Sequence, residues 1–217
     1  MAKYSNGIDT KKKIIDISKL LFYKKGYYET SFNEICSTAE VNNGSVVYHF
    51  KNKGSIAAQI YASVLSIFFD AADSLFPSED EITRILLSGG IHQKAFYQDL
   101  GYRRFSAQLN LEYSLGKLNV DFGKQYHLIY HYLTENTTSK RSDFYISIFK
   151  GLDGIIENYF YQNLEQYTLE EMILYSGELY YTYLPRDQFA TQLHHMLDLL
   201  KHVHIKNQGF DFVVSRD

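Results

Sequence analysis

Residues 30–53 read TSFNEICSTAEVNNGSVVYHFKNK, and this stretch decides the fold of the first part of the chain. Ser31 followed by Glu34 forms a capping box, in which each side chain can accept a bond from a backbone N–H at the start of a helix. Apolar residues then follow at the spacing of one helix face, namely Phe32, Ile35, Cys36 and Ala39. The sequence therefore predicts a short helix that begins beside Ser31 and buries one face.

A second short helix is predicted after a tight turn. Val41 provides a buried link, and Asn42 can cap a helix that begins at Asn43 or Gly44. The side chains that follow are small, polar or aromatic, whereas a core helix would carry a continuous apolar face. Two short helices in this arrangement form a helix-turn-helix, whose second helix can enter the major groove of DNA.

The segment before this motif supplies a third helix. Asp9 or Thr10 can cap it, and Lys24 and Lys25 occupy its last turn, where they complement the helix dipole. Gly26 follows as the left-handed residue that ends the helix. Its apolar face consists of Ile14, Ile17 and Leu21. The three helices together form one compact unit in this prediction.

The three-helix unit resembles the amino-terminal DNA-binding domain of TetR-family transcriptional regulators. The matching residues keep the family's order and spacing without a gap: Ile14, Ile15, Leu21, Phe22, Gly26, Tyr27, Thr30, Ser31, Ile35, Val41, Gly44, Ser45, His49, Phe50 and Lys53. The resemblance implies an all-α protein with a DNA-binding domain at residues 1–53 and a larger helical effector-binding and dimerisation domain at residues 54–217. The implied function is that of a repressor, which binds a palindromic double-stranded DNA operator as a homodimer and is released or modulated by a small-molecule effector.

Three positions depart from the family pattern. Ser18 stands where the family usually has alanine, Glu40 replaces a turn glycine, and Val47 replaces a tyrosine whose hydroxyl typically binds a DNA phosphate. Tyr48 cannot simply take over, because neighbouring side chains point about 100° apart on a helix. Either DNA affinity is lower, or Tyr48 and Lys51 rebuild the contact. The alternative function is a TetR-like protein that acts mainly by binding another protein, with weak or no specific DNA binding.

The DNA-contacting residues are expected on and around the second helix of the motif. Insertion of its amino end would bring Asn43, Ser45 and Tyr48 to base edges, and Gly44 lies at the same end. Asn33, on the exposed face of the preceding helix, would add a base contact. The residues expected to hold phosphates are Thr30, Ser31, Lys53 and His49, the last of which matches the family position that faces the DNA backbone.

Charge is divided unevenly along the chain. Residues 1–55 hold nine lysines and five acidic residues, a balance of +4, whereas residues 56–217 hold 13 basic and 20 acidic residues, a balance of −7. Together they give the net charge of −3. A basic amino-terminal part on an acidic body favours contact with nucleic acid through one end only.

The sequence lacks the common patterns of an enzyme or a metal protein. It has no phosphate loop, nucleophile elbow, paired catalytic carboxylates or zinc-protease helix, so we expect neither an enzyme nor a cofactor. Histidines group at His127 with His131 and at residues 194–204, but no Cys, Asp or Glu at ligand spacing accompanies them. We predict no metal site. The single cysteine, Cys36, is expected to be a buried apolar residue.

No membrane segment is predicted. The longest apolar stretch, residues 56–69, is interrupted by polar residues and is too short to span a bilayer. The chain also lacks the pattern of a signal peptide. We therefore expect a cytoplasmic protein without membrane contact.

Beyond residue 53 the spacing of apolar residues predicts helices almost throughout. The predicted ranges are 55–76, ended by Pro77; 78–87, ended by Gly89 and Gly90; and 92–115, 121–133, 138–161, 169–183 and 186–204. Only residues 209–214 show the alternation of a strand.

The dimer contact is assigned to helices 138–161 and 186–204, because the resemblance implies a four-helix interface built from two late helices of each subunit. The expected contact residues are Leu152, Ile156, Leu193, Met196, Leu197 and Leu200. An interface stripe and a core stripe have the same spacing, so the sequence leaves both interpretations open.

Aromatic residues are concentrated in the larger domain, where 15 of the 20 tyrosines and 12 of the 15 phenylalanines follow residue 55. The resemblance implies a small-molecule pocket there, with an expected lining of Phe96, Tyr97, Tyr102, Phe105, Tyr113, Tyr126, Tyr130, Phe149 and Tyr180. The alternative is that most of these side chains pack the core. A tyrosine-rich pocket near Glu112 or Glu178 would suit an aromatic or cationic effector. Helix 55–76 would transmit effector binding to the DNA-binding domain.

Overall fold

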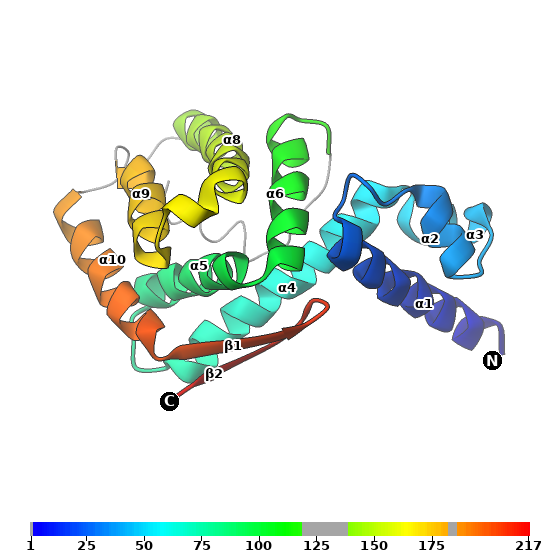
Figure 1. Cartoon of the computed structure of the whole chain (residues 1–217), viewed down its shortest axis with the longest axis horizontal. Helices are drawn as coiled ribbons and strands as arrows, with labels where there is room; N and C mark the ends of the chain where they lie inside the picture. Colours follow the sequence, from blue (N-terminus) through cyan, green and yellow to red (C-terminus); the bar gives the residue numbers. More distant parts are fainter. Residues whose placement is uncertain (1, 119–138, 182–185) are drawn as a thin grey trace.

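The structure is a computed structural model that describes residues 2–118, 139–181 and 186–217. Figure 1 shows a small helical unit, here called the head (residues 2–52), joined by one long helix to a larger unit, the body (residues 76–217 as far as described). The predicted helix 121–133, with Tyr126, Tyr130, His127 and His131, lies outside the described residues. The side chain of Tyr180 also lies outside them.

The head consists of α1 (Ala2–Lys25), α2 (Phe32–Thr38) and α3 (Asn43–Phe50). Both predicted caps are present. Ser31 Oγ accepts a bond from the Glu34 N–H at 3.1 Å, and Asn42 Oδ1 accepts one from the Ser45 N–H at 2.8 Å. α1 begins earlier than predicted and is followed, as expected, by Gly26 with a φ of 87°. The predicted three-helix unit is thus confirmed.

α4 (Lys53–Leu75) links the head to the body. Asn52 caps its start by accepting a bond from the Ser55 N–H at 2.8 Å, and Pro77 lies just after its end. By length and composition α4 could cross a membrane, which differs from the prediction made on its shorter apolar stretch. Half of the relevant window is buried inside the protein, as expected for a core helix of a globular domain. We therefore treat α4 as the central helix of the fold.

The helices of the body pack around α5 and α6. They are α5 (Glu81–Gln98), α6 (Leu100–Ser114), α8 (Ser139–Asn163), the short 3-10 helix η1 (Leu164–Gln166), α9 (Leu169–Tyr181) and α10 (Arg186–Lys201). α5 packs between α4 and α10, α6 packs along α8, and α9 packs on α10. The all-α class predicted from the sequence is confirmed, with one small sheet added to it.

Two predicted helix ends in the body are wrong. Gly89 and Gly90 lie inside α5, and the second of them lets α10 come close, because a Cβ at this position would lie 2.6 Å from Met196 Sδ. The predicted helix 92–115 is broken at Asp99, whose carboxylate caps α6 by accepting a bond from the Tyr102 N–H at 2.8 Å. Packing between helices and a new cap therefore set these boundaries.

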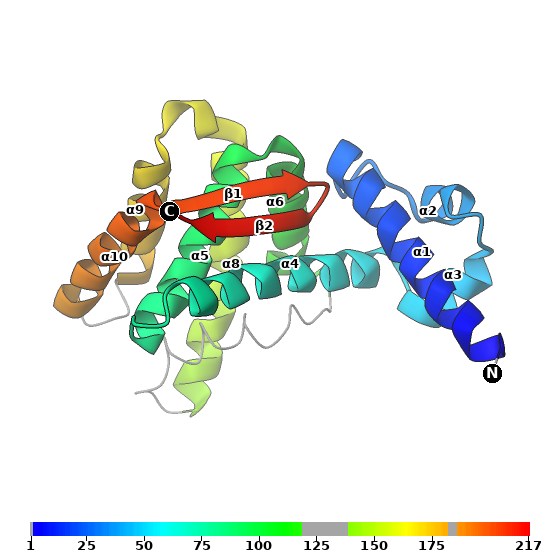
Figure 2. The ribbon, with the colours of Figure 1, turned by 90° about the horizontal axis from the view of Figure 1, so that it is seen from below.

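The segment after α10 forms a two-stranded antiparallel hairpin of β1 (Val203–Gln208) and β2 (Asp211–Arg216). The last helix therefore ends at Lys201 and not at His204 as predicted, while the strand pattern at residues 209–214 falls on the turn and β2. Figures 1 and 2 show the hairpin lying along α4 with its turn directed toward α1.

The hairpin turn has an unusual residue at its centre. Gly209 and Phe210 have φ values of 63° and 75°, as a two-residue type I′ turn requires. A bulky residue in this region costs on the order of 1–3 kcal/mol. Phe210 is completely buried, and burial of a phenylalanine side chain contributes about 1.5–3 kcal/mol. Burial of the ring thus offsets the strain of the turn.

Candidate DNA-binding surface

α3 has one buried face and one exposed face. Val46 and Phe50 are buried in the core of the head. The opposite side carries the predicted DNA-contacting residues of this helix, either exposed or half-buried: Asn43, Gly44, Ser45, Tyr48 and His49. Tyr48 protrudes with 84% of its surface exposed, and its ring lies edge-on to that of His49 at 5.0 Å. The structure therefore brings these residues together on one surface.

Asn33 of α2 joins the same surface. Asn43 Nδ2 donates to Asn33 Oδ1 at 3.5 Å, so two side-chain amides lie together on adjacent helices. Asn42 Oδ1 also accepts a bond from Ser45 Oγ at 3.1 Å, which holds the hydroxyl at the start of α3. Amide side chains are suited to base edges because they can donate and accept at the same time.

Thr30 and Lys53 do not belong to this surface, although both were expected to bind phosphates. Thr30 is completely buried and its hydroxyl donates to the carbonyl of Gly26 at 2.8 Å. Lys53 Nζ donates to the carbonyls of Tyr27 and Thr30, each at 2.8 Å, and lies 4.1 Å from the centre of the Tyr27 ring. Burial lowers the pKa of the Lys53 ammonium. Both side chains instead hold the loop after α1 against the start of α4.

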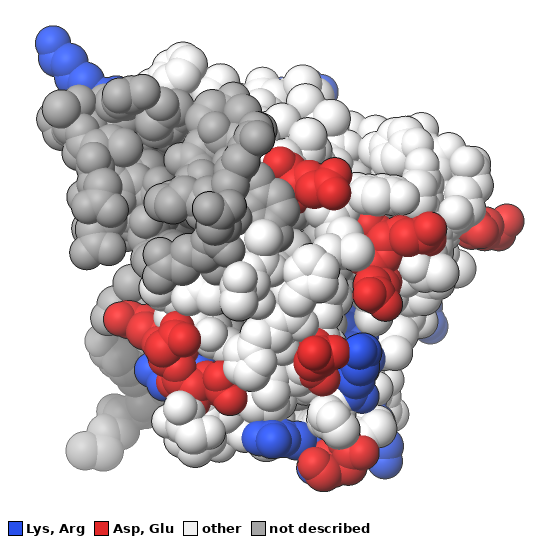
Figure 3. All heavy atoms as spheres, turned by 90° about the vertical axis from the view of Figure 1, so that its left-hand side faces the viewer, with Lys and Arg blue, Asp and Glu red and all other residues white. Residues whose placement is uncertain are grey.

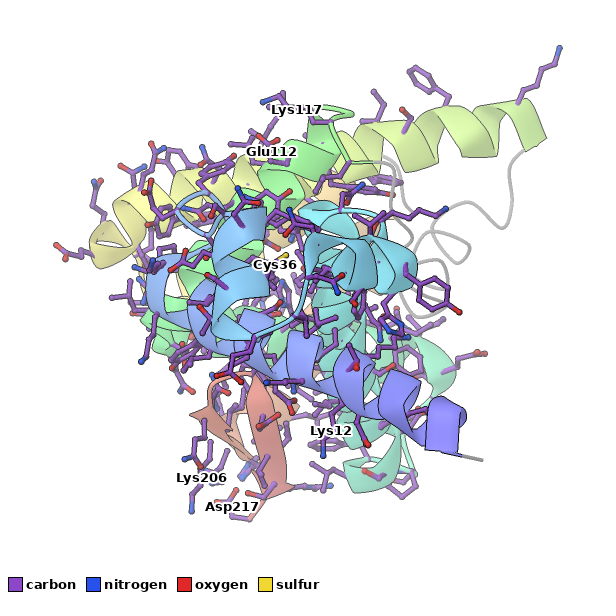
Figure 4. The ribbon with its side chains drawn as sticks, turned by 90° about the vertical axis from the view of Figure 1, so that its right-hand side faces the viewer. Lys12, Cys36, Glu112, Lys117, Lys206 and Asp217 are labelled. Carbon is purple, nitrogen blue, oxygen red and sulfur yellow. The ribbon has the colours of Figure 1, made fainter. Side chains whose placement is uncertain are left out.

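Other basic side chains of the head are better placed for phosphates. Ser31 and Lys51 are exposed near the two ends of the α2–α3 unit. Lys12 is exposed on α1, as Figure 4 shows in its view onto the head end of the molecule. Lys13 and Lys25, by contrast, form ion pairs with acidic residues of the head. Only some of the basic side chains of the head are therefore available to bind DNA phosphates.

The departures at positions 40 and 47 have visible consequences. Glu40 has a φ of 51°, a conformation that favours glycine, and its carboxylate lies 2.9 Å from Lys13 Nζ. Val47 is half-exposed beside Tyr48 on α3. An apolar group on this face cannot replace a tyrosine hydroxyl at a phosphate, but it can contact the methyl group of thymine.

Residues 14–60 match the sequence model for bacterial regulatory proteins of the tetR family. Residues 14–60 are thus similar to this family, and the match covers less than half of the chain. The matched residues contain the helix-turn-helix described above.

Several regulators are similar to the head of this chain. Over 49 residues the chain is 43% identical to the probable HTH-type transcriptional regulator YttP of Bacillus subtilis, covering 23% of this chain and 24% of that protein. Over 53 residues it is 38% identical to the HTH-type transcriptional regulator QacR of Staphylococcus aureus, covering 24% and 28%. The chain thus spans about a quarter of the length of these relatives. A TetR-family regulator of Pectobacterium atrosepticum aligns over 91% of this chain and 93% of its own, at 13% identity and a TM-score of 0.46.

The residues predicted to line an effector pocket lie mainly in the core of the body. Four of them are almost completely buried: Phe96, Tyr102, Phe105 and Phe149. Tyr97 and Tyr113 are half-buried, and Tyr97 donates its hydroxyl to the carbonyl of Tyr167 at 3.2 Å. The interpretation that many of these rings pack the core therefore holds for the first four.

A buried polar cluster in the body was missed by the sequence analysis. Glu157 of α8 accepts bonds from Ser106 Oγ at 2.7 Å and from Asn110 Nδ2 at 3.0 Å, both from α6. His92 of α5 lies 3.0 Å from the same carboxylate through Nε2 and 2.7 Å from the Tyr102 hydroxyl through Nδ1. Burial raises the pKa of Tyr102 well above its ordinary value. These residues are far apart in the sequence, so no local pattern could reveal the cluster.

The residues expected at the dimer contact divide into two groups. On α10 the expected residues are buried within the subunit: Leu193, Met196, Leu197 and Leu200. They face α5 and α9, where Gly90 and Gly177 allow a close approach. Leu152 and Ile156 of α8 are half-buried. The α10 stripe is therefore core, and it is not available to a second subunit.

A different apolar surface is open on α8 and α9. Its exposed large side chains are Phe144, Ile155, Tyr159, Tyr175 and Leu179. Figure 3 views the body from the end opposite the head and shows Asp and Glu side chains scattered among uncharged residues, with several Lys and Arg side chains in its lower part. An apolar area bordered by polar groups is typical of a protein contact.

Neither the cysteine nor the histidines form a metal site in the described part of the chain. Within residues 2–118, 139–181 and 186–217, no group of three or more His, Cys, Asp or Glu side chains is arranged to hold a metal ion. His195 lies 2.8 Å from Glu79, and His204 lies 3.2 Å from Asp217. Cys36 is buried as predicted, and burial raises the pKa of its thiol.

The position of Lys53 leads to a test of stability. We expect Lys53→Met to lower the free energy of unfolding by about 1–3 kcal/mol, because two backbone carbonyls lose their partner. The control is Lys51→Met, whose exposed side chain should change the same quantity by less than about 0.5 kcal/mol. Urea unfolding of both variants and the wild type measures the difference. Equal stability of the three proteins would contradict a structural role for Lys53.

Proposed function

We propose that the chain is a repressor that binds a palindromic operator as a homodimer and that a small-molecule effector changes its DNA affinity. The observation that carries this proposal is the exposed face of α3, where Asn43, Ser45 and Tyr48 lie beside Asn33 of α2. Because operator DNA is its partner, we also propose that the protein acts in the cytoplasm without a membrane contact.

The proposed base contacts follow from the chemistry of the α3 face. Asn43 and Asn33 would bind base edges through their amides, and Val47 with Tyr48 would contact thymine methyl groups. Ser31, His49 and Lys51 would hold phosphates and set the position of the helix in the groove. Lys51 takes the place that the sequence analysis gave to Lys53, since the Lys53 ammonium is bonded inside the protein.

A dimer is proposed because one helix-turn-helix buries little surface on DNA. Two heads related by a two-fold axis would bind inverted half-sites on one face of the duplex. The exposed apolar side chains of α8 and α9 support a contact there, since the α10 stripe is used inside the subunit. The proposed pair is therefore α8, which corresponds to the predicted helix 138–161, together with α9 in place of the predicted helix 186–204.

The effector is proposed to be an aromatic or cationic compound bound in the body. Support comes from Glu157, whose carboxylate is largely shielded from solvent and contacts His92. The other ring nitrogen of His92 contacts the hydroxyl of Tyr102. A cation would be attracted both by this carboxylate and by the faces of nearby rings. Glu157 therefore replaces Glu112 and Glu178 as the proposed anchor.

The first test concerns DNA sequence. The purified protein should capture genomic fragments of its source organism that share an inverted repeat. Asn43→Ala should change the preferred base at one position in each half-site, with a loss of about 1–3 kcal/mol at that base. Lys51→Met should instead weaken binding to all DNA sequences alike, and it should reduce the salt dependence of DNA affinity by about one counterion. Captured fragments without a common motif would favour the alternative, a TetR-family protein that acts by binding another protein.

The second test concerns the dimer. Ile155→Asp places a charge in the proposed α8–α9 contact and should shift the protein toward monomers in sedimentation, because burying an unpaired carboxylate is unfavourable. Val213→Asp is the control, since Val213 is equally exposed but lies on the hairpin. If Ile155→Asp and the control sediment as the same species, the contact lies elsewhere.

The third test concerns the effector. Aromatic cations and their neutral isosteres are titrated against the protein with and without the captured operator. Binding of an effector should change operator affinity about 5 to 150-fold, and operator must change effector affinity by the same factor. Glu157→Gln should weaken the binding of the cationic compounds, whereas Glu165→Gln, at an exposed position of η1, should leave their binding unchanged. Dissociation constants that are independent of operator for every bound compound would rule out the proposed switch.

A further inference from the structure

The turn of the carboxyl-terminal hairpin lies between the head and the body. The ring of Phe210 is 5.6 Å from that of Tyr23, which belongs to α1 of the head. The same ring is 4.8 Å from Phe105 and 6.2 Å from Tyr102, which belong to α6 of the body. Phe210 is completely buried by these neighbours. One side chain of the hairpin thus contacts both parts of the protein.

Polar contacts surround this ring. Asp211 Oδ1 lies 2.7 Å from Lys19 Nζ on α1. Asp99 Oδ2 accepts a bond from the Tyr23 hydroxyl at 2.8 Å and another from Asn207 Nδ2 of β1 at 2.7 Å. The carboxylate that caps α6 therefore also joins the head to the hairpin.

The other end of the hairpin is attached to the far end of α4. Arg216 Nη1 donates to the carbonyl of Leu75 at 3.0 Å, and its guanidinium lies 4.4 Å from the centre of the Phe76 ring. Between the two ends, the ring of Phe212 lies 5.0 Å from that of Phe68 on α4. Figure 2 shows the hairpin running beside α4 from this end toward α1. The hairpin thus links the body to the head, in addition to α4 and α6.

A separate set of contacts joins α6 of the body to the end of α1. Arg104 of α6 donates to the carbonyl of Tyr23 at 2.9 Å, and Gln108 accepts a bond from the Tyr28 N–H at 3.1 Å. These contacts and the start of α4 meet the head near the end of α1, where they form a pivot. Lys19 lies about one helical turn before this pivot. A contact there opposes rotation of α1 about the pivot.

We propose that the carboxyl-terminal hairpin is a strap that fixes the angle between head and body and thereby sets the spacing of half-sites that a dimer can bind. Phe210 adopts a backbone conformation that a bulky residue rarely takes, and its ring is the group that this turn inserts at the joint. The part of the proposal that concerns half-site spacing rests on the proposed function. The part that concerns the angle of the head does not.

The variant Phe210→Gly removes the ring contact between head and body without removing the hairpin. Glycine is favoured at a positive φ, so the turn is kept while the ring is removed. The control is Val213→Ala, at an exposed position of the same hairpin. As a second variant, Asn207→Ala combined with Asp211→Asn removes the hairpin's hydrogen bond to Asp99 and its ion pair with Lys19, and leaves the buried ring in place. It keeps the test valid if Phe210→Gly does not fold.

The angle of the head is measured by pulsed electron spin resonance on the full chain. Spin labels are attached at Lys12→Cys on α1 and Glu81→Cys on α5, in a Cys36→Ala background, and labelled subunits are diluted with unlabelled ones. We expect one narrow distance distribution for the wild type and Val213→Ala, and a broadened or shifted one for Phe210→Gly and for the double variant. Identical distributions in all four proteins would overturn the strap.

The effect of half-site spacing is measured by comparing the affinity for the operator with the affinity for a lengthened operator that has one base pair inserted at its centre. The wild type should bind the lengthened form more weakly, and Phe210→Gly should reduce this affinity ratio about fivefold or more, because a loosened head tolerates both spacings. A broadened distance distribution together with an unchanged ratio would overturn the link to spacing. If the protein binds no operator, the distance measurement still decides whether the strap exists.

Discussion

The structure depends on the packing of aromatic rings around Phe105 of α6. This side chain is completely buried and stacks on Phe22 of α1, with 5.3 Å between the ring centroids. Its ring centroid lies 6.4 Å from that of Tyr61 on α4 and 4.8 Å from that of Phe210 in the hairpin. Rings of the head, the linking helix, the body and the carboxyl-terminal hairpin thus meet at one point. Aromatic pairs of this kind are favourable beyond the area they bury, and their edge-on geometry is directional. The relative position of head and body follows from this packing.

The head is therefore less independent than a small DNA-binding domain on a linker. Its core includes the first turns of α4, where Ile56 and Ala57 are completely buried, and Lys53 bonds α4 to the loop after α1. A division at residues 53 and 54 remains a prediction about the chain, but packing continues across it. A change in the body can then reach the DNA-binding surface through α4, α6 and the hairpin, since each of these elements contacts α1 or the loop that follows it.

The buried polar cluster in the body has a physical consequence of its own. Removing the Glu157 carboxylate from water is unfavourable, and the bonds from Ser106, Asn110 and His92 compensate for this loss. Such a cluster keeps α5, α6 and α8 in a defined arrangement, because a shift of any helix would leave a buried charge without a partner. Since α8 also carries the proposed dimer surface, this arrangement connects that surface with the proposed effector site around Glu157.

The sequence by itself determined the helix-turn-helix and its resemblance to the TetR family, because its signals are local. Ser31, Asn42 and Gly26 act on backbone groups within a few residues, so caps and helix ends could be predicted from their neighbours. Partners distant in sequence decided the rest. Lys53 and Thr30 were assigned to DNA but bond inside the head, and the α10 stripe is core because α5 and α9 cover it. Residues 209–214 showed the alternation of a strand, but β1 was predicted as the end of the last helix and is a strand because it pairs with β2. Spacing shows that a side chain is apolar or charged, whereas only tertiary packing decides what it faces.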